Sequence, residues 1–238
     1  MESIVVLTVG WSLFNTDPVC APLVRDKARR EATHAAANSF LSGYGRRLEH
    51  CRSGRPVAVQ ASGESVGGVS ITYGGKGGAV AIAASPTIGI DREPGQSLPD
   101  VERLAESTCD PAEYSAALSA AHPATAFLRI WTRKEAAFKA ALIGTSCDPR
   151  LVVVGVGGCG WNSIATDFAP SYQGPLHVRT WTFGAAGRFA VLSVAAPCPA
   201  TVRFRPSPVA AWSPESFADN VAESSILTTA PIDFGRWS

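Results

Sequence analysis

The chain has 238 residues, of which 46% are hydrophobic and 17% are charged, a composition typical of one large globular domain or two small ones. Its formal net charge of +1 gives no overall indication of nucleic-acid binding. There is no run of 18 apolar residues and no basic leader before the first apolar stretch, so neither a transmembrane helix nor a signal peptide is expected.

The first part of the chain predicts one long helix among short strands. Apolar β-branched residues predict a strand at 3–9, and alanines four apart predict a helix at 26–43. Further strands are expected at 57–60, 69–73, 79–84 and 87–91. A glycine-rich turn at 74–78 is expected to join the third and fourth of these five strands.

The second part predicts three helices followed by strands. A short helix starts near Asp100, and the sequence Asp-Pro-Ala-Glu at 110–113 favours a capping box that opens another. The stretch 126–142 has apolar residues at helical spacing, with Thr125 as its expected cap and Gly144 as its expected end. Strands are expected at 151–156, 178–183, 188–195 and 201–204, before a Pro/Ser-rich tail.

Two segments repeat in the same order. Residues 30–37 resemble residues 134–141, and the hairpin that starts at Val69 resembles the one that starts at Val178. The offsets are similar, which favours a duplicated unit over chance likeness between alanine-rich helices. We therefore predict an α+β fold made as a pseudodimer. Each half is a small antiparallel sheet packed on a long helix, with the active site at the interface between the halves. The expected boundaries are 1–98, 99–205 and a tail at 206–238.

Charge is distributed unevenly, with an excess of five positive charges over residues 25–55 and of five negative charges over residues 91–122. Both stretches could be solvated faces; together they could also be an anion pocket beside a cation site. Asp91 and Glu93 end a short strand, and alternate residues of a strand point the same way. They are either two solvated acids or a pair that converges on a cation such as Mg²⁺. Glu135 and Lys139, one helical turn apart, are either a surface ion pair or part of the same site.

These acids lie in two stretches that resemble the signatures of the 4′-phosphopantetheinyl transferases. IGIDRE at 88–93 resembles (I/V)G(I/V)D-x-E, and WTRKEAAFK at 131–139 resembles (W/F)(S/T/C)xKE(A/S)xxK. The resemblance covers roughly residues 25–200. Length and apparent duplication are similar to the larger, surfactin-activating (Sfp-type) class, a monomeric pseudodimer.

The resemblance implies transfer of the phosphopantetheine arm of coenzyme A to a serine of an apo acyl or peptidyl carrier protein, with release of adenosine 3′,5′-bisphosphate. It implies a Mg²⁺ site, with Mn²⁺ as an alternative, on Asp91, Glu93 and Glu135. Glu135 would also take the serine proton, and Lys139 would contact the phosphate and assist the leaving oxygen. The carrier protein would dock near 94–121. A monomer in the cytoplasm is expected, with no nucleic-acid or membrane partner; the carrier could serve fatty-acid, polyketide or peptide synthesis.

The coenzyme A contacts are expected in the first half. By resemblance they are Arg55 with Pro56, Ser70 and His34, with Arg25, Lys27, Arg29 and Arg30 as further cations. The chain departs from the family at Tyr73, where a histidine commonly binds the 3′-phosphate. A neutral tyrosine makes a weaker phosphate contact, so Arg55 or Lys76 must supply the charge.

Other interpretations fit less well. The glycines at 155, 157 and 160 match a dinucleotide fingerprint in spacing, but no helical pattern follows them, so a glycine-rich turn is the better prediction. The turn at 74–78 lacks the GK(S/T) ending of a phosphate loop, and the four histidines lack ligand spacing for zinc. Six cysteines without CxxC spacing are expected to be reduced thiols, although their even number leaves disulfides open. The alternative function is a catalytically inactive family member that binds a carrier protein or coenzyme A, which Tyr73 alone favours.

Overall fold

The computed structural model describes residues 2–10, 22–74, 77–95, 98–142, 147–158, 160–185 and 188–206. The chain divides into two compact units: unit 1 contains residues 1–86 and 200–238, and unit 2 contains residues 87–199. Both combine helices with antiparallel strands, so the predicted α+β class is confirmed. Within the described ranges no helix has the length and apolar content needed to span a membrane.

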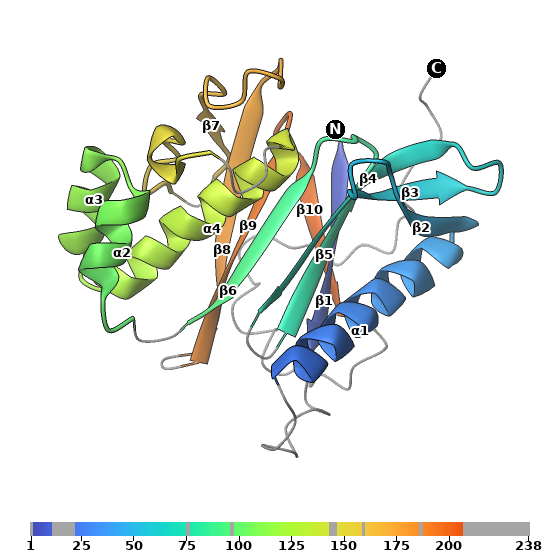
Figure 1. The fold of residues 1–238 in the computed structure, drawn as a ribbon, viewed down its shortest axis with the longest axis horizontal. Coiled ribbons are helices and arrows are strands. Elements are labelled where there is room, and N and C mark those ends of the chain that lie inside the picture. Colours follow the sequence, from blue (N-terminus) through green and yellow to red (C-terminus); the bar gives the residue numbers. More distant parts are fainter. Residues whose placement is uncertain are drawn as a thin grey trace. The chain divides into compact units, whose positions relative to one another are not determined.

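Unit 1 is a six-stranded sheet with one long helix, α1 (Pro22–Ser42), packed on it (Figure 1). Its strands in sheet order are β10 (Thr201–Pro206), β1 (Ser3–Gly10), β5 (Gly77–Ala83), β4 (Ser65–Gly74), β3 (Pro56–Gln60) and β2 (Arg46–His50). All pairs are antiparallel except β1 with β10, which run parallel with Ser3 opposite Thr201. The core under α1 includes Ala37, Leu41 and Ile82.

Unit 2 is a four-stranded antiparallel sheet with the helix α4 (Pro123–Ala141) lying along one face (Figure 1). Its strands in sheet order are β6 (Gly89–Pro94), β9 (Arg188–Ala196), β8 (Leu176–Ala185) and β7 (Asn162–Ile164). The strand β6 falls in the sequence of the expected first half, yet it pairs with β9 of unit 2. This pairing brings both signature motifs into one unit.

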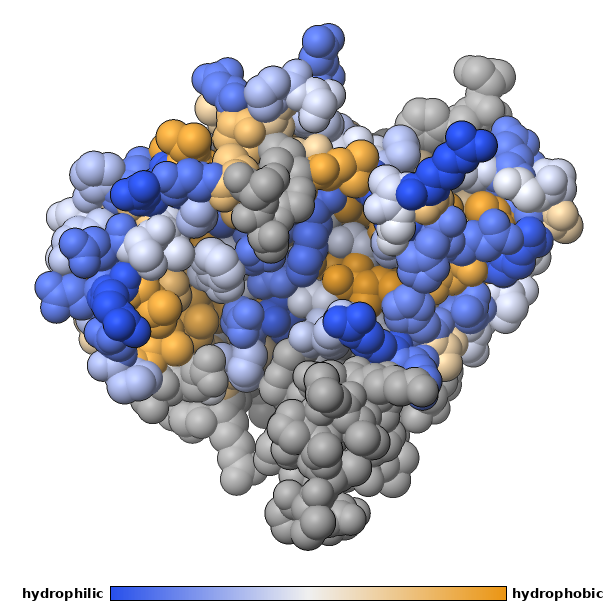
Figure 2. Space-filling model, viewed as in Figure 1, coloured by the Kyte–Doolittle hydropathy of each residue, from blue (hydrophilic) through white to orange (hydrophobic). Residues whose placement is uncertain are grey.

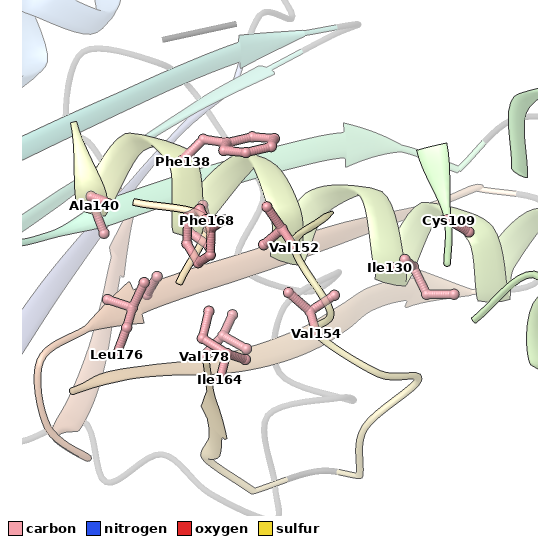
Figure 3. Close-up of a cluster of buried hydrophobic side chains, with 14 of the residues drawn as sticks. Cys109, Ile130, Phe138, Ala140, Val152, Val154, Ile164, Phe168, Leu176 and Val178 are labelled. Carbon is pink, nitrogen blue, oxygen red and sulfur yellow. The ribbon is translucent and has the colours of Figure 1, made fainter. Parts of the chain in front are cut away.

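The helix α4 is covered on two sides, so its apolar residues and also Arg133 and Lys134 are buried. The sheet lies on one side, and the helices α2 (Val101–Thr108) and α3 (Pro111–Leu118) pack on it as well. Figure 3 shows the cluster in which Ile130 and Phe138 of α4 meet Val152, Val154 and residues of β7 and β8. Phe138 and Phe168 make an edge-to-face pair with ring centroids 6.1 Å apart.

The structure corrects three sequence predictions. The long helix begins at Pro123, with His122 rather than Thr125 at the cap position, because a proline at the first position already has helical φ. Residues 151–156 do not form a strand; the short 3₁₀ helix η2 (Pro149–Leu151) leads into an extended segment without strand partners in the described chain. The strands β2 and β7 were not predicted, since both are short and mostly polar. Gly144, expected to end the helix, lies outside the described residues, and the helix ends on Leu142 with a left-handed φ of 61°.

Candidate active site in unit 2

The strand β6 places two acids on the face of the sheet that α4 covers. Asp91 lies opposite Ser193 of β9, and Glu93 lies opposite Val191. Residues two apart in a strand share a face, so both carboxylates point to the same side. Asp91 is buried and Glu93 is half-buried. The alternation predicted from the sequence is therefore the one that the strand has.

A row of buried hydroxyl groups fixes α4 on this face. Ser193 pairs with Thr180 across the sheet, and their hydroxyl oxygens lie 2.9 Å apart. The hydroxyl of Thr132 on α4 lies 2.9 Å from the same Ser193 oxygen. Because Asp91 lies opposite Ser193, the acid and the three hydroxyl groups belong to one row of the structure. Thr132 thus sets the position of α4 directly beside the acid.

Gly89 at the start of β6 allows α4 to approach the strand closely. A Cβ added at Gly89 would lie 1.9 Å from the carbonyl oxygen of Ala136 and 2.7 Å from the backbone nitrogen of Ala140. Neither backbone atom can move without shifting the helix. The glycine of the first motif is therefore required by packing against the helix that carries the second.

The contact between the two motifs is an ion pair. The ammonium nitrogen of Lys139 lies 2.7 Å from Oδ1 of Asp91 and donates also to the carbonyl oxygen of Ile90 at 3.1 Å. Of the two interpretations of Glu135 and Lys139, a surface pair within the helix is not the one observed: the salt bridge of Lys139 reaches Asp91 on β6. This salt bridge links the helix α4 to the strand β6 at Asp91, the acid beside the row of hydroxyl groups.

Two of the three acids, Glu93 and Glu135, have raised pKa values. Burial and the neighbouring charge of Asp91 raise the pKa of Glu93 to about 7, although Lys139 and Arg92 oppose the rise. Burial and Asp91 also raise the pKa of Glu135. Such mutual repulsion means that the carboxylates share one electrostatic environment, which an added cation would relieve.

The donor set suits a divalent metal by its chemistry, since Mg²⁺ prefers oxygen ligands and carboxylates. In the part of the chain that the structure describes, however, no three His, Cys, Asp or Glu side chains are gathered closely enough to form a metal site. One carboxylate oxygen of Asp91 is bonded to Lys139 instead. The residues therefore fit such an ion in type and charge, and Lys139 provides the positive charge at Asp91.

A second ion pair lies in unit 2 and was not predicted. Lys134, the residue before Glu135, lies 2.6 Å from Glu113 of α3, with both side chains at most 2% exposed. Lys134 also donates to the carbonyl oxygens of Pro149 and Val152, and Glu113 accepts hydrogen bonds from the backbone nitrogens of Val154 and Gly155. These bonds replace a strand partner for residues 149–155. The capping box at Asp110 was predicted correctly, but nothing in its pattern showed that Glu113 would also bind a lysine.

The expected coenzyme A residues belong to unit 1. His34 of α1 stacks on His50 of β2 with ring centroids 5.4 Å apart, and burial, His50 and Arg30 lower its pKa. Arg55, at the entry to β3, is partly buried, which lowers its pKa. Beside it Pro56 begins β3, and Ser70 is buried on β4. These positions stay predictions as binding residues.

The tyrosine that departs from the family pattern lies beside a cation. The guanidinium carbon of Arg30 lies 5.1 Å from the centroid of the Tyr73 ring. Positive charge is thus present next to the position where the family has a histidine. Lys76, the other expected source of charge, lies outside the described residues.

Comparison with known proteins finds a family model that matches part of the chain. Residues 87–171 match the family model of the 4′-phosphopantetheinyl transferase superfamily. The matched stretch contains β6, the three helices α2, α3 and α4, and β7. No curated protein sequence matches the chain. The matched domain includes every residue of the site described above that comes from β6 and α4.

Proposed function

We propose that the chain, which carries a domain of the 4′-phosphopantetheinyl transferase superfamily, transfers the phosphopantetheine arm of coenzyme A to a serine of an apo carrier protein. The observation that carries the proposal is the meeting of both motifs at one place, where Lys139 of the second motif binds Asp91 of the first. The two motifs are therefore in direct contact in the structure and are not only similar to the family in sequence.

The bond changes are those of a phosphoryl transfer. The serine Oγ forms a bond to the phosphorus that carries pantetheine, and the bond from that phosphorus to the oxygen of adenosine 3′,5′-bisphosphate breaks. Glu135 takes the serine proton, for which its raised pKa makes it a stronger base than an exposed glutamate. Lys139 contacts the phosphate and supports the leaving oxygen.

Asp91, Glu93 and Glu135 would hold the Mg²⁺ or Mn²⁺ ion that the family uses. Such an ion supplies positive charge to the pyrophosphate oxygens. The protein's own contribution would be to bring these carboxylates together around the ion, beside Lys139. Lys139 holds the Asp91 carboxylate in place by its direct bond.

The finer assignment is the Sfp-type class, a monomeric pseudodimer. Each unit contains a long helix packed on a hairpin: α1 with β4 and β5 in unit 1, and α4 with β8 and β9 in unit 2. The cations and histidines of unit 1 would bind the adenosine end of coenzyme A. There Arg30 would supply the charge that Tyr73 lacks, which offsets the one feature that favoured the inactive binder.

The carrier protein would dock on the segment 94–121. Figure 2 shows one face of unit 2, on which hydrophilic side chains over α2 border an apolar patch. On α2, Glu102, Arg103, Leu104 and Glu106 are exposed. Charge reversals on this helix should lower carrier modification; unchanged modification would place the docking surface elsewhere.

Mass spectrometry tests the reaction. An apo carrier protein incubated with coenzyme A, Mg²⁺ and the full chain should gain one phosphopantetheine mass. A panel of carriers from fatty-acid, polyketide and peptide synthases should be used, because the sequence does not select among them. No gain with any carrier, together with retained binding of coenzyme A, would favour the inactive binder.

A further inference from the structure

The guanidinium of Arg133 is buried in unit 2 without a full set of partners. The residue is 1% exposed, and its Nη1 donates to the carbonyl oxygen of Gly155 at 2.9 Å. Its Nε and Nη2 are also buried and have no hydrogen-bond partner among the residues that the structure describes. A guanidinium has five N–H donors, so most of its capacity is unused. Leaving charged donors unsatisfied inside a protein costs free energy.

The local charge does not balance. Arg133 and Lys134 are adjacent buried cations, and Glu113 is the acid that faces them. Both oxygens of Glu113 are already engaged: one accepts from Val154 and Gly155, and the other binds Lys134 and accepts from the backbone of Asp110. The Asp110 carboxylate caps α3 at the backbone nitrogen of Glu113. One buried positive charge is therefore left over.

Arg133 keeps its proton in this setting. An arginine guanidinium is not deprotonated in proteins, so Arg133 carries its positive charge at neutral pH. Arg129, one turn earlier on α4, is a second cation near it. Arg133 therefore does not become neutral by losing a proton, as many buried charged groups do.

A glycine-rich segment lies against the guanidinium. Gly155 and Gly157 have positive φ angles of 62° and 43°. A Cβ at Gly157 would lie 1.7 Å from Nη1 of Arg133 and 2.6 Å from Nη2. Gly155, through its carbonyl oxygen, and Gly157, through its bare Cα, thus bring backbone to the cation. Both belong to the run that resembled a dinucleotide fingerprint in spacing only.

We propose that Arg133 of α4 and the glycine segment 155–157 beside it form a binding site for a small inorganic anion. The anion accepts from Nε and Nη2 and offsets the excess buried charge, with Arg129 adding to the positive potential. The site is separate from the transfer reaction and does not depend on it. Its occupation fastens residues 155–157 to α4 at Arg133, two residues from Glu135.

Thermal unfolding of the full chain tests the site. Sodium gluconate, whose anion is bulky, is replaced stepwise by sodium chloride or sodium phosphate at constant ionic strength and pH 7.5. At about ten times the dissociation constant, the bound anion should raise the Tm by about 3 °C. The variant Arg133→Met, which keeps the side-chain length without the charge, should lose this rise. The matched control is Arg103→Met, whose exposed guanidinium pairs with Asp100, and it should keep the rise.

Each outcome of this experiment supports or overturns the anion site. A Tm of the unaltered chain that does not respond to either anion would overturn the proposal, as would an equal rise in Arg133→Met. If Arg133→Met does not fold, Arg133→Lys retains the charge but loses the fork of donors. Its titration midpoint should then shift at least about tenfold to higher anion concentration, since an ammonium cannot reproduce the paired N–H geometry. An unchanged midpoint would also overturn the site.

Discussion

Lys134 and Lys139 belong to one motif and one helix, yet the structure gives them opposite surroundings. Lys134 is sealed from solvent, bonded to Glu113 and to two carbonyl oxygens. The side chain of Lys139 is 32% exposed, and it binds an acid whose neighbours carry raised pKa values. A buried ion pair whose groups have all their hydrogen-bond partners serves the structure. A partly exposed lysine beside acids with raised pKa values can instead exchange its partner for a substrate. Burial and saturation therefore distinguish the structural lysine from the chemical one.

The largest effect on stability is expected at the sealed pair. Lys134→Met leaves the Glu113 charge buried without its cation and should lower the free energy of unfolding by about 3–5 kcal/mol. Chemical denaturation measures it, and Arg103→Met, at an exposed pair, should change it by less than about 1 kcal/mol. The double variant Lys134→Met/Glu113→Gln removes both charges and should recover part of the loss. No recovery would mean that the pair matters through packing and not through charge.

Glu135→Gln, at the residue after Lys134, should lower activity without lowering stability. Carrier modification should fall by at least about 100-fold, because the amide cannot accept the serine proton. The free energy of unfolding should stay the same or rise, since one of three mutually repelling carboxylates is gone. Coenzyme A binding, measured by calorimetry, should be largely intact. Near-normal turnover would remove Glu135 from the reaction, and a large loss of stability would erase the contrast with Lys134.

Gly89→Ala tests whether the two motifs need their close approach. The added methyl group would collide with the backbone of Ala136, so the strand and helix must separate, at a cost of about 2 kcal/mol. The longer distance should weaken the bond between Lys139 and Asp91 and reduce turnover as well. Gly45→Ala serves as the control for a glycine whose added Cβ meets nothing within 4 Å, although its φ of 67° adds some backbone strain. Equal effects on turnover in both variants would contradict the packing argument.

Thr132→Val should have the smallest effect. It removes one hydroxyl from the buried row but leaves Ser193 bonded to Thr180, so about 1 kcal/mol of stability should be lost. Thr132→Ser keeps the hydroxyl and should restore turnover more fully than it restores stability. If valine supports the same turnover as threonine, the hydroxyl row only packs the helix and does not position it.

The site was predictable from sequence where its chemistry follows the periodicity of one element. Asp91 and Glu93 share a face because strands alternate, and Glu135 and Lys139 share one because a helix turns every 3.6 residues. The bond from Lys139 to Asp91 crosses between elements 48 residues apart, and no local pattern encodes it. The same limit explains the missed pair of Glu113 and Lys134 and the false strand at 151–156. There the continuous apolar run predicted a strand, but the side chains of Glu113 and Lys134, and not a neighbouring strand, bind the backbone.

The parallel pairing of β10 with β1 has a consequence for biosynthesis. Unit 2 is continuous in sequence, whereas unit 1 needs residues 201–206 to cover one edge of β1. A nascent chain emerging from the ribosome therefore holds all of unit 2 before the sheet of unit 1 can close. Until then the outer edge of β1 presents unpaired backbone groups to other chains, which is a recognised route to aggregation. A chain truncated before residue 200 should thus contain a folded unit 2 and an aggregation-prone sheet in unit 1 that lacks β10.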